Sequence, residues 1–281
     1  MKLDLNAAWD QAVRLIGANR EVLLVLGGVF FFLPYVLFSL LVTLPDFATI
    51  AGPSGENRAA LQASLNGFLL QYWWALLLLA LAVSAGAIAV MAVIGDPARP
   101  TVGAAMARGG RFLPTSIGAQ LLSSLATSLV LFVATLLGLL TGSEGIATTL
   151  SLFALPVIVW LTTRWSLSGA VIAIERTANP LAALRRSWRL THGNGLRLFA
   201  FYLLLFAAFF VVSQVLGLVI RLIVALPGAE VARVVGALLS GLLLTAIILV
   251  MYAVLASIHR QFARAERTRA ADAGTPDPAQ P

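Results

Sequence analysis

The sequence contains no cysteine and few charged residues. The absence of cysteine excludes disulfide bonds, thiolate metal sites and a cysteine nucleophile. Only 11% of the 281 residues are charged and 60% are hydrophobic, whereas about 25% of the residues in a soluble domain are charged. The composition therefore indicates a protein whose main solvent is the lipid bilayer.

Sequence motifs for catalysis are also missing. The chain has no glycine-rich phosphate loop, nucleophile elbow, zinc motif or pair of carboxylates within an apolar run. Its N-terminus has no basic segment that leads into a short apolar run and a small-residue cleavage site, so we expect no signal peptide. These absences favour a protein that is not an enzyme and has no metal or other cofactor.

Six apolar runs are long enough to cross a bilayer as helices. A bilayer core about 30 Å thick requires about 20 apolar residues per helix, and the runs cover residues 22–44, 68–94, 117–140, 150–174, 198–226 and 234–258. We therefore predict an all-α polytopic membrane helical bundle with six transmembrane helices. Pro34 and Pro156 lie inside two of the runs, where we expect local kinks.

The distribution of basic residues predicts the orientation of these spans. The net charge is +7, but the 19 basic residues are spread between the apolar runs and do not form one nucleic-acid-binding domain. Most of them lie before the first, third and fifth runs and after the sixth, whereas the opposite connections contain Arg58, Arg221 and Arg233. The positive-inside rule then places both termini in the cytoplasm.

Two segments differ from the apolar runs. We expect residues 1–262 to form the integral membrane domain and residues 263–281, which are rich in Ala, Arg, Asp and Pro, to form a helical extension that ends in a disordered cytoplasmic tail. The longest external connection, residues 46–67, contains the turn-forming sequence Gly-Pro-Ser-Gly at 52–55. A short surface helix is expected over residues 57–64.

A short segment recurs in register before the first, third and fifth runs. It begins with a residue that can cap a helix, has alanine four residues later and arginine ten residues after the cap. The copies contain Asp4, Ala8 and Arg14; Thr101, Ala105 and Arg111; and Asn179, Ala183 and Arg189. We therefore expect three amphipathic interfacial helices, each followed by two spans, in repeat units 4–95, 101–175 and 179–262.

Details of the copies differ. Pro180 occupies the favoured first position of a helix, and Asn19 and Asn194, at equivalent places, suit the left-handed residue that ends one. Gly109 and Gly110 lower the helix propensity of the middle copy. Caps, alanines and arginines are common in cytoplasmic loops, so chance combined with the positive-inside bias is the alternative to a true repeat.

The third copy carries a family resemblance. Its sequence NPLAALRRSWRLTHGN at 179–194, with AIE at 173–175, resembles the signature of the bacterial membrane-domain family named after glycerophosphoryl diester phosphodiesterase. Members look like six-span proteins, some of them fused to a soluble phosphodiesterase barrel; His192 departs from the signature. Such a barrel needs about 250 residues, far more than follow the sixth run. The resemblance implies a six-span fold in the bacterial cytoplasmic (inner) membrane, without glycerophosphodiester hydrolysis.

Arg164 is the most informative single residue. It lies in the fourth apolar run, where inserting an arginine at mid-membrane costs about 2.5 to 3.5 kcal/mol. Gln120 and Ser124 in the third run and Gln214 in the fifth are its expected partners. The guanidinium either binds an anionic headgroup or substrate within the bundle, forms internal hydrogen bonds, or reaches the interface by snorkelling.

The segment before the fifth run concentrates basic residues. Arg185, Arg186 and Arg189 lie beside Trp188, a combination that an anionic leaflet attracts by about 1 kcal/mol per basic residue. We expect lipid-headgroup contact here, as for Arg14 and Arg111 in the other copies. Docking of an acidic protein partner or of a specific phosphate ligand at the cytoplasmic face is the alternative.

Residues around the bend before this segment are expected to be structural. Glu175 is predicted to pair with Arg176, Arg185 or Arg189 and to form a hinge together with Asn179, Pro180 and Asn194. His192 and His259 both lie at cytoplasmic ends of spans, so we expect ordinary surface histidines rather than proton carriers.

The sequence favours a non-catalytic membrane module that organises or handles lipid, with anionic membrane lipids as the expected partners, or another amphipathic molecule. A secondary transporter or export component is an alternative because transporters often contain repeats, although no acidic residue lies at mid-membrane to carry protons. A scaffold for a protein partner is another alternative. An intramembrane enzyme is the least favoured, because no nucleophile or base can be identified.

Overall fold

The computed structural model describes residues 4–43, 58–95, 100–225 and 228–274, and all regular secondary structure in these ranges is helical. Six segments are long and apolar enough to span a membrane: Arg20–Leu41, Ala60–Gly95, Val102–Leu140, Thr148–Glu175, Gly195–Val224 and Glu230–Thr268. The predictions of an all-α fold and of six apolar spans are confirmed.

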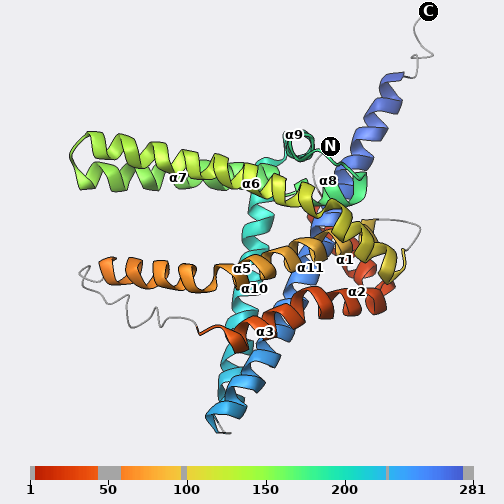
Figure 1. The fold of residues 1–281 in the computed structure, drawn as a ribbon. Helices are drawn as coiled ribbons and strands as arrows, with labels where there is room; N and C mark the ends of the chain where they lie inside the picture. The colour runs from red at the N-terminus through yellow and green to blue at the C-terminus, as the bar shows by residue number, and fades with distance from the viewer. Residues whose placement is uncertain (1–3, 44–57, 96–99, 226–227, 275–281) are drawn as a thin grey trace, which may run out of the picture.

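The elements follow the chain as α1 (Leu5–Ala18), α2 (Arg20–Gly27), the π-helical segment η1 (Gly28–Phe32), α3 (Leu33–Leu41), α5 (Arg58–Gly95), α6 (Val102–Leu140), α7 (Glu144–Trp165), α8 (Ser168–Glu175), α9 (Pro180–Leu190), α10 (Gly195–Val224) and α11 (Ala229–Gly274). Figure 1 shows α6 and α7 side by side as a hairpin that extends away from the other helices, while α10 and α11 meet at the bottom of the view. The outer ends of these two hairpins diverge.

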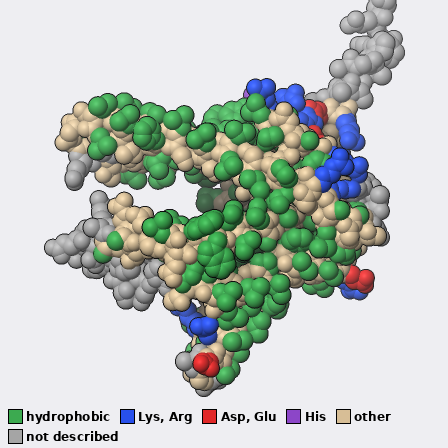
Figure 2. All heavy atoms as spheres, viewed as in Figure 1, with side chains coloured by type: hydrophobic (Ala, Val, Ile, Leu, Met, Phe, Trp, Pro, Cys, Tyr) green, Lys and Arg blue, Asp and Glu red, His purple; other side chains and the backbone are tan. Residues whose placement is uncertain are grey.

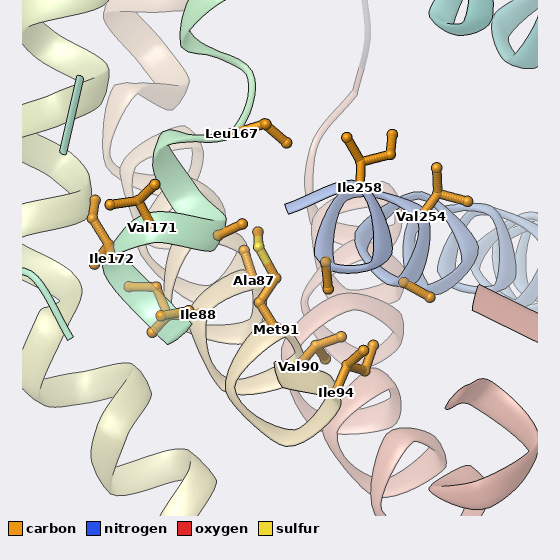
Figure 3. Close-up of a cluster of buried hydrophobic side chains, with 14 of the residues drawn as sticks. Ala87, Ile88, Val90, Met91, Ile94, Leu167, Val171, Ile172, Val254 and Ile258 are labelled. Atoms are coloured by element: carbon orange, nitrogen blue, oxygen red, sulfur yellow. The ribbon is translucent and has the colours of Figure 1, made fainter. Parts of the chain in front are cut away.

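The buried core lies where the hairpins converge, and we call this region the helix junction (residues 8–26, 84–94, 167–190 and 253–262). Figure 3 shows buried side chains of α5, α8 and α11 in this core, among them Ile88, Val171 and Ile258, none of which is more than 1% exposed. In the most apolar stretch of 18 residues of each span, 56% of the residues are buried in the second span but only 6% in the third and fifth spans. Exposed apolar side chains on these spans can face lipid tails, which are as apolar as the core.

The three predicted helix caps are confirmed. Each cap side chain accepts a hydrogen bond from an amide of the first turn: Asp4 Oδ1 from Ala7, Thr101 Oγ1 from Ala104 and Asn179 Oδ1 from Leu181, at 3.0, 3.3 and 2.9 Å. The alanines that follow four residues later, Ala8, Ala105 and Ala183, are all 0% exposed. Their complete burial explains why a small residue occupies each of these positions.

The middle copy does not form a separate helix, contrary to the prediction. Helix α6 runs without a break from Val102 to Leu140 and includes Pro114. Gly109 permits close packing instead of ending the helix: a Cβ atom built on it would lie 2.7 Å from the carbonyl oxygen of Ala85 on α5. The glycine is therefore explained by the contact between α5 and α6.

The prediction that Asn19 and Asn194 adopt the left-handed conformation is wrong. Their φ angles are −123° and −122°, and Gly193, with φ of 79°, takes the left-handed position next to Asn194. Glycine adopts this conformation without a steric cost because it lacks a Cβ atom. Arg176, with φ of 56°, ends α8 in the same conformation.

One expected boundary differs and another agrees with the structure. Residues 58–64 belong to the continuous helix α5 and do not form a separate surface helix, while residue 57 lies outside the described residues. Helix α11 continues past residue 263 to Gly274, as expected of a helical extension, and the rest of the predicted tail lies outside the described residues. The first span contains η1 directly before Pro34, where the missing proline amide prevents a regular helical hydrogen bond.

Candidate functional site

Arg164 lies against two adjacent tryptophan rings, in the last turn of α7 and within the fourth apolar span, Thr148–Glu175, as expected. Its Cζ atom is 5.5 Å from the ring centroid of Trp160, one turn earlier on α7, and 5.3 Å from that of Trp188 on α9. The two rings meet edge to face at 4.8 Å. Cation–π contacts of this kind contribute about 0.5 to 2 kcal/mol each, so the tryptophans hold the guanidinium in place.

The side chain of Arg164 has little hydrogen bonding. Its Nε and Nη1 atoms are buried and have no hydrogen-bond partner among the described residues. Gln120, an expected partner, instead donates to the hydroxyls of Ser84 and Ser116 at 3.0 and 3.2 Å and so links α5 to α6. Among the described residues no carboxylate forms an ion pair with Arg164, and the two aromatic rings stabilise its guanidinium by cation–π contacts.

The other two expected partners also lack a hydrogen bond to Arg164 in the part of the chain that the structure describes. Ser124 is exposed on α6, where its carbonyl accepts a bond from Thr127 Oγ1 at 3.0 Å. Gln214 is exposed on α10. The combination of Gln120, Ser124, Gln214 and Arg164 therefore does not form one hydrogen-bonded site.

Helix α9 caps the end of α7 and so positions the arginine. Ser187 Oγ donates to the Arg164 carbonyl at 2.7 Å, and Thr191 Oγ1 donates to the same oxygen at 3.4 Å. Both hydroxyl residues are 0% exposed. Carbonyls in the last turn of a helix have no partner within that helix. The two hydroxyls therefore supply hydrogen bonds to the Arg164 carbonyl that α7 itself cannot provide, and they join α7 to α9.

An apolar groove of about 340 Å³ runs between α7 and α10 beside this cluster. A Cβ atom built on Gly195 would lie 3.6 Å from Arg164 Cζ, so the start of α10 lies against the guanidinium. Phe199, one turn further along α10, already lines the groove. The remaining lining residues are Val159, Thr162, Thr163, Tyr202, Leu203 and Phe206. A cation and an apolar groove are therefore adjacent.

A second polar cluster joins α8, α9 and α11 in the helix junction. Glu175 accepts hydrogen bonds from Arg186 Nε at 3.1 Å and lies 3.0 Å from His259 Nε2. Arg186 also binds Glu266 at 2.6 Å. The bond to Glu266 raises the pKa of the Arg186 guanidinium above its usual value, and partial burial, which lowers the pKa, does not cancel this effect. Arg186 is thus fully charged at neutral pH.

This second cluster differs from the expected one. Glu175 does bridge the bend into α9, but through Arg186 and not through Arg185 or Arg189. The expectation of two surface histidines is correct for His192, which is exposed, and wrong for His259, which is only 2% exposed. No local sequence signal marks His259, because its partner is 84 residues away.

A pocket of about 920 Å³ opens next to the second cluster. Its lining includes Glu175, Arg186, His259 and Glu266, together with the ends of α1 and α5. Among the described residues, no group of three His, Asp or Glu side chains could hold a metal ion.

The remaining predicted contact residues lie mostly on the surface. Arg14, Arg111, Arg185 and Arg189 are exposed. Figure 2 shows most of the visible arginine side chains toward the upper right of the view and others at the bottom, whereas hydrophobic side chains cover the projecting helices. Pro180, the first residue of α9, packs near Gly118 of α6: a Cβ atom built on that glycine would lie 3.2 Å from the proline ring.

The fold and these sites define the class of a polytopic helical membrane protein. A scan against protein-family models found no match, and searches against curated proteins and against solved structures found none at a significant level. The resemblance of residues 179–194 to the phosphodiesterase membrane-domain family therefore stays a prediction.

Proposed function

We propose that the protein is a non-catalytic membrane module that handles anionic phospholipid and that it binds such a lipid at Arg164. The observation that supports this proposal is the guanidinium held against the ring pair of Trp160 and Trp188, with two buried nitrogen atoms that lack a hydrogen-bond partner among the described residues. A lipid phosphate supplies both the missing acceptors and the missing negative charge.

The surroundings of Arg164 match the rest of such a ligand. The groove between α7 and α10 begins about one helical turn away and is lined mainly by Val159, Leu203 and aromatic side chains, so it suits an acyl chain. On α9, Arg185 and Arg189 are exposed beside Trp188, as in helices that lie among headgroups. An amphipathic ligand would meet charge at one end and apolar surface at the other.

The proposal includes the arrangement of the chain in the membrane. Three repeat units, each starting with a capped helix, would place Arg14, Arg111 and Arg189 on the cytoplasmic face of the bacterial inner membrane, with both termini on that side. The shared caps and the fully buried Ala8 and Ala105 support the repeat. The resemblance to the phosphodiesterase membrane-domain family is kept for the fold alone.

Thermal unfolding in detergent tests the lipid site. Added phosphatidylglycerol is expected to raise the melting temperature of the wild-type protein more than phosphatidylcholine does, because a ligand that binds only the folded state stabilises it. Arg164→Gln is expected to lose much of this difference, and Arg164→Lys to retain part of it because the charge remains without the planar guanidinium.

Arg221→Gln is the matched control, since Arg221 is an exposed arginine in the last turn of α10, far along that helix from Gly195. An equal response of the wild type, Arg164→Gln and Arg221→Gln to phosphatidylglycerol would show that Arg164 has a structural role only.

A further inference from the structure

A second site follows from the 920 Å³ pocket in the helix junction. We propose that this pocket binds a phosphorylated anion. The described residues that line it include two glutamates, Glu175 and Glu266, and six arginines: Arg108, Arg176, Arg186, Arg260, Arg264 and Arg267. The pocket shares no residue with the Arg164 cluster or its groove, so this inference does not depend on the function proposed above.

The arginines on α11 form one face of a helix. Arg260, Arg264 and Arg267 are spaced by four and three residues, which places them on the same side of α11. Like charges at these spacings repel one another and destabilise a helix. An anion bound beside Arg264 and Arg267 reduces their mutual repulsion, so the bound ligand stabilises the folded chain.

The two glutamates in the pocket, Glu175 and Glu266, are both paired with the same arginine. Both carboxylates bind Arg186, and Glu175 is also held by the buried His259. Glu266 is 53% exposed and belongs to the same turn of α11 as Arg264 and Arg267. An entering anion therefore competes with Glu266 for Arg186 while it gains the arginines of α11.

The size and walls of the pocket fit a small phosphorylated ligand or a lipid headgroup. Its volume of about 920 Å³ lies in the range of known ligand sites, about 300 to 1,000 Å³. Val93 and Ile94, each 1% exposed, form part of its wall, and low-dielectric walls strengthen the field of the surrounding arginines. Guanidinium groups bind phosphate through paired, charge-assisted hydrogen bonds.

The test uses the full chain in nanodiscs of pure phosphatidylcholine and isothermal titration with inorganic pyrophosphate. The double variant Arg264→Gln, Arg267→Gln is expected to bind pyrophosphate at least about tenfold more weakly. Glu266→Gln is expected to bind it several-fold more tightly, because a competing carboxylate is removed. The control Arg20→Gln removes an exposed arginine that does not line the pocket and should bind as the wild type does.

A parallel arm replaces part of the phosphatidylcholine with phosphatidic acid and measures the melting temperature. Pyrophosphate binding with these variant effects identifies a soluble phosphorylated ligand. Stabilisation by phosphatidic acid that the double variant loses, without pyrophosphate binding, identifies a lipid headgroup. The proposal is overturned if neither compound acts on the wild type, or if the double variant responds as the wild type does. A negative result for lipid binding at Arg164 would not change what these outcomes say about the pocket, because the two sites share no residue.

Discussion

At the scale of single residues, Glu175 holds the helix junction together. Its carboxylate binds Arg186 on α9 and the buried His259 on α11, and is itself only 28% exposed on its side chain. A carboxylate with two partners on two other helices fixes the direction in which the chain leaves α8. The left-handed Arg176, the next residue, makes the bend itself.

Replacing Glu175 with Gln is expected to destabilise the protein by about 1 to 3 kcal/mol, because the change leaves Arg186 and buried His259 without their shared charged acceptor. Glu266→Gln is the matched control: its side chain is 53% exposed and, among the described residues, is paired with Arg186 alone, so a loss below about 1 kcal/mol is expected. Denaturant unfolding in detergent measures both, and equal losses would contradict this account.

The residue scale also separates what could and could not be predicted. Asp4, Thr101 and Asn179 were predictable as caps because a cap depends on amides two to three residues away. The pairing of Glu175 with His259 was not, because it depends on how α8 packs against α11. Arg164 was singled out from the sequence as a buried cation, but its contact with Trp188 depends on the packing of α9 against α7.

At the scale of helices, glycines have two different roles. Gly109 is buried and approaches the backbone of Ala85 to a distance that no side chain can occupy. Gly110 is its neighbour on α6, and a Cβ atom added there meets no atom within 4 Å. Both were interpreted from the sequence as residues that weaken a helix, because propensity does not distinguish a packing glycine from an exposed one.

Gly109→Ala is therefore expected to lower the melting temperature, because the added methyl group pushes α5 and α6 apart. Gly110→Ala should leave it unchanged or raise it, since alanine favours a helix by about 1 kcal/mol over glycine. The two variants make the same chemical change one residue apart, and thermal unfolding of the purified proteins compares them. A loss with Gly110→Ala as large as that with Gly109→Ala would disprove the packing role.

At the scale of the whole molecule, span number was predictable and the arrangement of spans was not. Runs of about 20 apolar residues identify helices that can cross a bilayer, and all six were located. The divergence of the α6–α7 hairpin from α10 and α11 could not be predicted (Figure 1), because lipid-facing and protein-facing surfaces of a membrane helix are equally apolar.

The proposed topology can be tested by labelling, since the chain has no native cysteine. Ser143, in the turn between α6 and α7, and His192, between α9 and α10, are separated by one span. A membrane-impermeant maleimide added to spheroplasts is expected to label Ser143→Cys and not His192→Cys, with the reverse result in inside-out vesicles. Labelling of both from the same side would contradict the orientation.

The central claim is that Arg164 binds an anionic phospholipid, and native mass spectrometry after purification with mixed phosphatidylglycerol and phosphatidylcholine tests it most directly. The wild type and Arg221→Gln are expected to retain phosphatidylglycerol in preference to phosphatidylcholine, and Arg164→Gln to lose this preference. Equal retention of phosphatidylglycerol by all three proteins, or by none of them, would contradict the claim.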